Sequence, residues 1–322
     1  MTAGGAKRAR QTYLRAQGAE AEGNYSKAER IYKALIRGLR LTPPQELRVD
    51  VYRSLADLYR ILGRYRESDA AFAAAFMIAD KVYTKDAIEH WRLLNGRAIL
   101  YKYCGRFAVG ARLYGTALKI LTSANGSHYS EIATIYHNLG GLEHARGRYA
   151  IGEQFARKGI TIRRRALGAD HPAVVADEAA LAALLLAQKK FGEAELLLRR
   201  ALRIFRRASQ PENYDVAIAL SNLGSLEQAR GNFTAALRYH KEALRIKEKL
   251  FGPHHVDIAV TLNNIAVVYR EQQRLAEALP LFSRALSILQ ASVSSRHPNL
   301  IKCQKNYVAL LQVPSRLQQA KA

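Results

Sequence analysis

Cysteine, tryptophan, methionine and proline are all scarce in this sequence. Its 322 residues include two cysteines, two methionines, one tryptophan and eight prolines. Cys104 and Cys303 lie far apart and form no metal or redox motif, so a disulfide framework is excluded and a reducing compartment is expected. The chain also lacks an uncharged apolar run of about 18 residues, which a membrane span requires. No apolar segment follows the charged N-terminus, which excludes a secretory signal, and we therefore expect a cytoplasmic protein.

Acidic residues are the other deficit of the sequence. The 27 aspartates and glutamates stand against 50 lysines and arginines, which gives a formal charge of +23. An excess of this sign predicts an acidic protein partner, a nucleic acid or an anionic surface. Arginine-rich helices that are only well solvated would have the same composition, so charge alone does not choose among these interpretations.

Catalytic and cofactor-binding motifs are missing as well. The sequence contains no P-loop, no GxSxG or HExxH motif and no dinucleotide-binding fingerprint. His137 and His144 are spaced to share one helical face, but no third ligand at a suitable spacing accompanies them. We therefore expect no catalytic residue, no metal site, no cofactor and no enzymatic activity.

What the sequence does contain is a long-period repeat. A turn residue, an aromatic or apolar residue two positions later and a small residue three positions after that recur seven times, with the turn residues at 23, 63, 105, 147, 189, 231 and 273. Small residues recur seven positions before and five positions after each turn, and bulky residues occupy the columns beside them. Periods of three and four residues predict a helix hairpin in each repeat. Glycine at five of the seven turns is typical of a helix that ends in the left-handed conformation.

One repeat segment and a recurring His-Pro motif carry a family resemblance. The segment LNNIAVVYREQQRLAEALPLFSRAL at 262–286, and Asp170-His171-Pro172 with His297-Pro298 at the same register, resemble the 42-residue repeats of kinesin light chains and their bacterial relatives in the tetratricopeptide repeat family. The resemblance implies an all-α fold, a right-handed superhelical α-solenoid of about seven hairpins with a concave groove. We expect a single array over 9–313 that ends in a capping helix at 298–313, with flexible tails at 1–8 and 314–322.

The first helix of each hairpin lines the groove in this family and supplies the candidate site. Nine residues before the turn, asparagine recurs on the first helices and in the cap. An amide donates and accepts hydrogen bonds, which suits the backbone of an extended peptide, whereas the alternative role is to bridge adjacent helices. With the neighbouring polar and cationic positions, the candidate peptide-binding residues are Arg53, Arg60, Asn95, Lys102, His137, Asn138, Ser221, Asn222, Asn263, Asn264, Arg270, Lys302, Lys305 and Asn306.

The leading hypothesis is a protein–protein interaction scaffold that binds an extended, acidic peptide or protein segment in the concave groove. One alternative is binding of nucleic acid or an anionic surface by a convex stripe of cations on the second helices, although cations are also favoured there by the helix dipole. The stripe contains Arg157, Lys158, Arg164, Arg165, Arg199, Arg200, Arg203, Arg206, Arg207, Lys241, Arg245 and Lys249. A second alternative is a peptide-sensing regulatory subunit.

Overall fold

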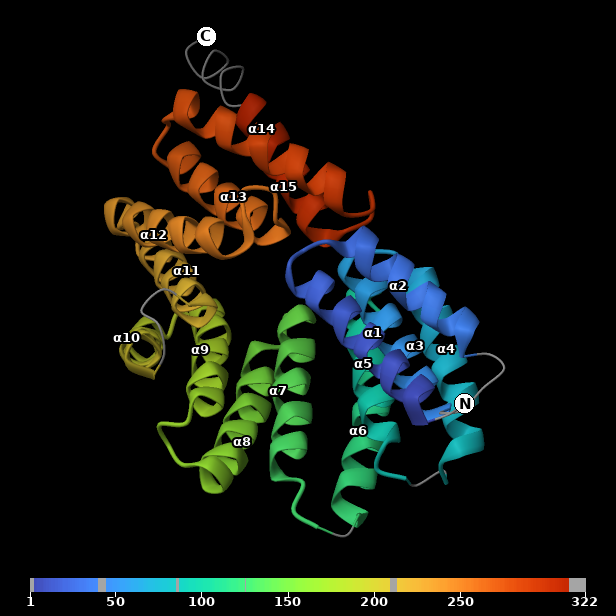
Figure 1. Cartoon of the computed structure of the whole chain (residues 1–322). Coiled ribbons are helices and arrows are strands. Elements are labelled where there is room, and N and C mark those ends of the chain that lie inside the picture. The colour runs from blue at the N-terminus through green and yellow to red at the C-terminus, as the bar shows by residue number, and fades with distance from the viewer. Residues whose placement is uncertain (1–2, 40–44, 85–86, 125, 209–212, 313–322) are drawn as a thin grey trace. The chain divides into compact units, whose positions relative to one another are not determined.

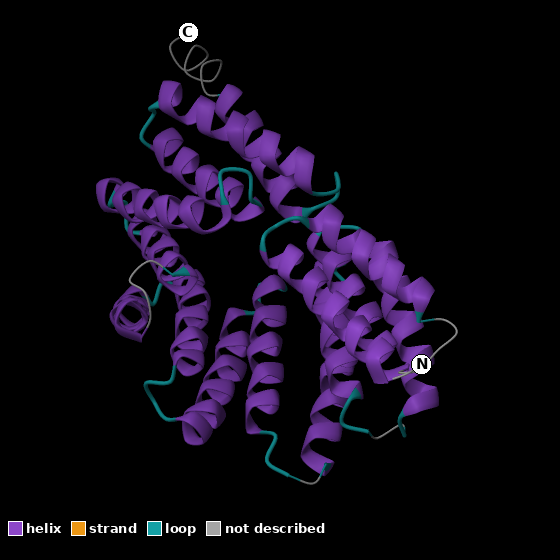
Figure 2. Ribbon diagram, viewed as in Figure 1, coloured by secondary structure: helices purple, strands orange, loops and turns teal. Residues whose placement is uncertain are grey.

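A computed structural model describes residues 3–39, 45–84, 87–124, 126–208 and 213–312 of the chain. Over these ranges the protein forms fifteen α-helices and no β-strand, which confirms the predicted all-α fold. Figure 2 shows the helices joined by loops. None of the described helices is both long and apolar enough to cross a membrane. The helices belong to two compact units, unit 1 at Met1–Gly147 and unit 2 at Arg148–Ala322.

Unit 1 holds three helix hairpins and one further helix (Figure 1). Its helices are α1 (Ala3–Ala21), α2 (Tyr25–Gly38), α3 (Gln45–Ile61), α4 (Tyr65–Val82), α5 (His90–Tyr103), α6 (Phe107–Ser123) and α7 (Tyr129–Ala145). The first helices α1, α3, α5 and α7 each contact the next one in this series, and the second helices pack behind them. The first helices therefore form a continuous surface of unit 1, which we call first-helix face 1.

Unit 2 repeats the arrangement. Its helices are α8 (Tyr149–Leu167), α9 (Pro172–Ala187), α10 (Phe191–Ala208), α11 (Tyr214–Ala229), α12 (Phe233–Phe251), α13 (Val256–Glu271), α14 (Leu275–Ser292) and α15 (Pro298–Leu311). The first helices α9, α11, α13 and α15 contact one another in order and form first-helix face 2.

The ends of the array differ slightly from the expected boundaries. Helix α1 begins at Ala3, so residues 3–8, which the sequence analysis assigned to a flexible tail, are helical. Ala6, Lys7 and Arg8 favour a helix here, whereas Gly4 and Gly5 oppose it. The capping helix α15 covers Pro298–Leu311, and the tail expected at 314–322 lies outside the described residues.

All seven predicted turn residues adopt the left-handed backbone conformation. The five glycines have φ angles between 71° and 80°, whereas Lys189 and Gln273 have φ angles of 59° and 61°. Glycine reaches this region without steric cost because it has no Cβ atom. The positive φ angles thus fall at the positions read from the sequence, and Lys189 and Gln273 occupy positions that are unfavourable for their side chains.

The small-residue columns explain how the helices approach one another. Alanines seven positions before the turn, such as Ala56, Ala98 and Ala266, are completely buried, as are the large side chains of Tyr32 and Phe282 nine positions after it. These residues interlock between the two helices of a hairpin, because a small side chain leaves room for a large one opposite.

Two departures from the core pattern are accommodated locally. The fully buried His240 replaces an aromatic residue, and a Cβ atom on Gly224 would lie only 2.6 Å from its ring. Gly224 thus provides the space that the imidazole needs. Arg97 occupies an apolar column, and its Nε atom donates to Asp69 at 2.8 Å, an aspartate that also accepts a hydrogen bond from the Tyr101 hydroxyl at 3.0 Å.

Histidines begin three of the first helices. The Nδ1 atoms of His171, His255 and His297 each accept a hydrogen bond from the backbone N–H two residues later, at 3.2 Å. His171 and His297 are each followed by proline at the first helical position, where the missing N–H costs nothing. The His-Pro signature is therefore a helix N-cap, which orients each first helix.

Candidate functional site

The asparagines of first-helix face 1 bond to each other. The side-chain amide of Asn138 on α7 donates to the side-chain oxygen of Asn95 on α5 at 2.7 Å. This contact joins two neighbouring first helices, which is the bridging role that the sequence analysis kept open. Each amide retains further hydrogen-bonding capacity, since an asparagine side chain has two N–H donors and an acceptor oxygen.

The same pair recurs at the equivalent place in unit 2. The amide of Asn306 on α15 donates to Asn263 on α13 at 3.0 Å, and Asn263 donates weakly to Asn264 at 3.5 Å. Asn263 is 5% exposed and so contributes to packing rather than to a surface. Asn222 is partly exposed, and its side chain has no hydrogen-bond partner within the described residues, so it is the asparagine best placed to meet a ligand.

The remaining candidate peptide-binding residues of first-helix face 2 have different surroundings. Ser221 donates to the carbonyl of Ala217 at 2.9 Å, as serine does within many helices. Arg270 donates to the backbone oxygen of Asn306 at 3.3 Å and so helps to hold the capping helix. Lys302 and Lys305 on α15 are exposed and form no ion pair within the described part of the chain. These two lysines therefore present free positive charge on face 2.

First-helix face 1 carries a column of basic residues three positions before the turns at 63, 105 and 147. Arg60, Lys102 and His144 occupy this position on the successive first helices α3, α5 and α7, and we call them the cation column. Burial, followed by the charge of Arg60, lowers the pKa of Lys102. Burial, followed by the charge of Lys102, lowers the pKa of His144. The three groups are thus close enough to influence each other.

Carboxylates accompany only one end of the column. Arg60 bonds to Asp57 at 3.4 Å, and Glu20 at the same register on α1 is near enough for Arg60 to act on its charge. Arg53, one further candidate, lies 3.7 Å from Asp57 and 3.8 Å from Asp50. No carboxylate within the described residues pairs with Lys102. Positive charge is therefore in excess at Lys102, in the middle of the column.

Tyrosines lie near the cation column. The ammonium of Lys102 lies 5.1 Å from the ring centre of Tyr103, and the guanidinium of Arg60 lies 5.8 Å from the same ring. The hydroxyls of Tyr65 and Tyr114 are buried without a hydrogen-bond partner among the described residues. Burial raises the pKa of Tyr65 to about 12, and Arg60 opposes that shift, which places this hydroxyl near the column. Tyr114 is also within electrostatic reach of Arg60 and Tyr103.

Tyr65 and Tyr114 are the part of the site that sequence reasoning missed. Tyr114 belongs to the column of large core residues nine positions after the turn, and its aromatic ring is enough to explain it there. The equivalent Tyr32 donates to Glu20 at 3.0 Å, which shows that a hydroxyl at this position reaches the residue three before the turn. Comparison of the two columns would have linked Tyr114 to Lys102. Together the groups offer cations and hydroxyl donors, the chemistry that binds a carboxylate.

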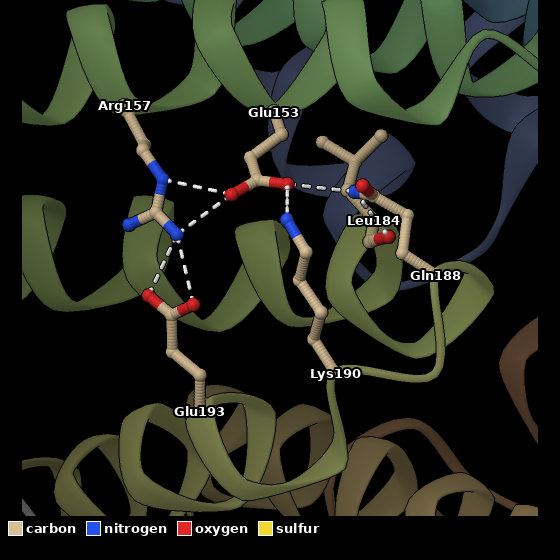
Figure 3. A network of polar contacts seen from close by, with 6 residues as sticks. All are labelled: Glu153, Arg157, Leu184, Gln188, Lys190 and Glu193. Carbon is tan, nitrogen blue, oxygen red and sulfur yellow. Dashed lines mark hydrogen bonds and ion pairs between the residues drawn. The ribbon is translucent and has the colours of Figure 1, made fainter.

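The convex stripe is different, because much of its charge is already paired. In the network of Figure 3, Glu153 accepts from Arg157, Gln188 and Lys190, each at 2.7 Å, and Arg157 also pairs with Glu193 at 2.7 Å. Burial alone would raise the pKa of Glu153, but these bonds lower it to about 2. The network holds α8 to the turn between α9 and α10.

Other members of the stripe are neutralised in the same way. Arg164 and Arg200 both pair with the buried Glu178, while Arg199 pairs with Glu195 and Arg206 with Glu242. In the described residues, Arg165, Arg203 and Arg207 are exposed and take part in no ion pair. Pairing therefore leaves less free charge for a phosphate backbone than the composition alone indicates.

The buried cation Lys247 in unit 2 bonds to hydroxyl groups, whereas its equivalent in an earlier repeat bonds to a carboxylate. Arg163 lies sixteen residues after the turn at 147. It donates to Asp177, which is fourteen residues further along the chain, at 2.7 Å. At the equivalent positions in a later repeat, Lys247 donates to the Thr261 hydroxyl at 3.0 Å and to Ser221 at 3.4 Å. Burial lowers the pKa of Lys247, while Asp257 acts in the opposite direction. Lys247 is 3% exposed and so is not a ligand contact.

Comparisons with known proteins agree with this architecture. No curated protein sequence matches the chain. Among solved structures, BtubC (BKLC) from P. vanneervenii matches with 21% identity and a TM-score of 0.52, over 77% of this chain and 92% of that one. A Rap protein complexed with competence and sporulation factor matches with 14% identity and a TM-score of 0.58, over 88% of this chain and 76% of that one.

The matched structures also include the repeats of a putative kinesin light chain from Podosopora anserina, with 19% identity and a TM-score of 0.49, over 62% of this chain and 95% of that one. The family model for the tetratricopeptide repeat matches residues 131–207, 215–291 and 257–321, which together make up more than half of the chain. With the repeat register and helix hairpins described above, this match shows that the chain belongs to the tetratricopeptide repeat family.

Proposed function

We propose that the protein is a non-enzymatic interaction scaffold that binds an extended acidic peptide or protein segment on first-helix face 1. The observation that carries this proposal is Lys102, a half-buried cation that lies beside Arg60 and His144 and has no carboxylate partner among the described residues. A buried charge without a partner is unfavourable, and an incoming carboxylate would remove that cost.

The surroundings of Lys102 support a carboxylate rather than a neutral ligand. The unpartnered hydroxyl of Tyr65, a half-buried residue, would complete its hydrogen bond by donating to a carboxylate oxygen. Charge-assisted hydrogen bonds of this kind are roughly twice as strong as neutral ones. The Rap protein structure, solved with a bound factor, shows that a protein of the same fold binds a ligand. Such binding would serve a scaffold or a peptide-sensing regulatory subunit equally.

Fluorescence anisotropy with a labelled ten-residue polyglutamate peptide tests the proposal. The substitution Lys102→Ala is expected to weaken binding by about tenfold, which corresponds to about 1.4 kcal/mol. Lys119→Ala is the matched control, since Lys119 is an exposed lysine on the second helix α6 of the same hairpin. A polyglutamine peptide of the same length should bind no variant measurably. Equal binding of polyglutamate by the wild-type protein and the Lys102→Ala variant would contradict the carboxylate site.

The phosphate-binding alternative keeps one specific observation in its favour, the exposed and unpaired arginines at positions 165, 203 and 207. It predicts retention on a DNA column at low salt that is lost when Arg203 and Arg207 are changed to glutamate. Retention that the Lys102→Ala variant loses instead would assign the binding to the cation column.

A further inference from the structure

A pocket of about 310 Å³ lies on unit 1 beside the N-terminal ends of three first helices. Its lining comes from the start of α3, the segment before α5, the first turn of α5 and the start of α7. The charged and aromatic residues that line it are Asp50, Arg53, Tyr83, Glu89, Trp91, Arg92, His128 and Glu131. None of them belongs to the cation column, so this pocket is a separate feature of the same face.

The pocket differs from the cation column in carrying carboxylates, although Arg53 and Arg92 line it as well. It offers three carboxylates and the only tryptophan of the chain. Asp50 already pairs with Arg10 at 3.3 Å, but Glu89 and Glu131 pair with no cation among the described residues. Burial raises the pKa of Tyr83, and the charges of Glu46, Glu89 and Asp50 raise it further, so Glu89 and Asp50 lie within electrostatic reach of this phenol.

The aromatic wall of the pocket already attracts a cation. The guanidinium of Arg92 lies 5.8 Å from the centre of the Trp91 ring. A cation over the face of tryptophan is stabilised by the electron-rich ring, and free carboxylates beside it add to that attraction. The buried Nε atom of Arg53 has no acceptor among the described residues, and the carbonyl of a peptide backbone would supply one. Pocket, ring and unpaired carboxylates thus fit a lysine or arginine side chain of a bound peptide.

The pocket and the cation column are held at a defined distance by the helices that carry both. Asp50 and Arg60 are ten residues apart on α3, as are Arg92 and Lys102 on α5. An α-helix rises about 1.5 Å per residue, so the two sites are about 15 Å apart along the helices. An extended peptide advances about 3.4 Å per residue, and two of its residues four positions apart are therefore about 14 Å apart.

We infer that first-helix face 1 recognises a peptide with two opposite charges, whose lysine or arginine enters the pocket of Trp91, Glu89 and Glu131 while its carboxylate reaches the cation column. This inference rests on the proposed function and adds the composition and spacing of the ligand. The peptide runs parallel to the axes of the first helices, and its two charged residues are about four positions apart.

Competition against the labelled polyglutamate probe tests this arrangement with unlabelled, terminally capped peptides. The first peptide is Lys-Ala-Ala-Ala-Glu, and a second carries norleucine, which has a similar length but no charge, in place of lysine. Two further peptides separate lysine and glutamate by one and by seven alanines. We expect the three-alanine lysine peptide to bind about tenfold more tightly than the norleucine peptide, and the two other spacings to lose most of that advantage.

Variants separate the two sites. In a Glu89→Gln, Glu131→Gln double variant, the lysine and norleucine peptides should bind alike, at the affinity that the wild-type protein has for norleucine. Lys102→Ala should weaken both peptides by the same factor. If the wild-type protein does not distinguish lysine from norleucine while Lys102→Ala still weakens both, the pocket is not a cation site and the carboxylate site stands. If neither peptide nor polyglutamate binds in a Lys102-dependent way, the proposed function itself fails.

Discussion

The buried Lys247 provides a sensitive test of how the repeats tolerate charge. Lys247 and Arg163 occupy equivalent positions, but the aspartate that pairs with Arg163 is replaced by Thr261 beside Lys247. A hydroxyl neutralises no charge, and burial accordingly lowers the pKa of this lysine. The change Thr261→Asp would restore the pair seen between Arg163 and Asp177 in the earlier repeat.

The expected gain follows from the energetics of buried charge. A hydrogen bond to a charged group contributes about 1.5–3 kcal/mol, and we expect Thr261→Asp to raise the free energy of unfolding by about 1–3 kcal/mol near neutral pH. The reciprocal change Asp177→Thr leaves Arg163 buried without its partner, and breaking a buried pair in this way costs about 3–5 kcal/mol. The two substitutions thus have opposite expected signs at equivalent positions of the fold.

The pH dependence of the free energy of unfolding provides a second test of Lys247. The folded protein lowers the pKa of Lys247, so below the unfolded value of about 10.4 the unfolded chain binds more protons. Stability therefore increases as the pH rises towards about 10.4, where the unfolded chain also loses the proton. Thr261→Asp raises the pKa of Lys247 again and should flatten this increase.

Urea denaturation at about pH 7 and about pH 9.5, followed by circular dichroism, measures both effects. The reasoning is refuted if Thr261→Asp lowers the denaturation midpoint at neutral pH, or if it leaves the rise of stability with pH as steep as in the wild-type protein. Asp177→Thr serves as the internal control, because it must destabilise the protein if buried cations here require a carboxylate.

Two further predictions concern local features of the core and the turns. The fully buried His240 has both ring nitrogens without partners, and burial, followed by the charge of Lys247, lowers its pKa to about 4. The unfolded chain takes up the proton first as the pH falls, so stability should decrease by up to about 3 kcal/mol between about pH 6.5 and pH 4. His240→Leu should remove that decrease in urea denaturation, since Leu198 fills the same column, and an unchanged pH profile would contradict the assignment. At the turns, Lys189→Gly should raise the free energy of unfolding by about 1 kcal/mol by relieving a positive φ angle of 59°. The thermal unfolding midpoint measures this gain in stability. Gly231→Ala should lower the midpoint. A lower midpoint for Lys189→Gly would contradict the argument from backbone strain.

The fold was predictable because its signals are local. Each turn needs a residue that tolerates positive φ, and each close helix contact needs a small side chain, so both recur at fixed positions in the sequence. Where the pattern breaks, the compensation is not local. Gly224 makes room for His240 sixteen positions later, and Asp69 neutralises Arg97 from the preceding hairpin. The pairing of Asp69 with Arg97 joins two hairpins and cannot be read from a single repeat.

Some parts of the candidate site were likewise predictable from the sequence, and others were not. The recurrence of asparagine and of cations on the first helices was visible in the sequence, and the structure places Arg60, Lys102 and His144 close enough to influence one another. The bond between Asn95 and Asn138 was not predictable, because its partners are separated by one residue more than the repeat length. The pocket at Trp91 was missed because its lining comes from four separate segments that share no motif.

The sequence by itself determined the repeat length, the helix hairpins, the turns and the surplus of positive charge, since these depend on residue type and spacing along one chain. Only the tertiary structure decided which charges remain free. Arg157, Arg164 and Arg200 find carboxylates on neighbouring helices, whereas Lys102 does not. The physical reason is that an ion pair requires two groups within about 4 Å, and that distance between residues of different hairpins is set by how the helices pack.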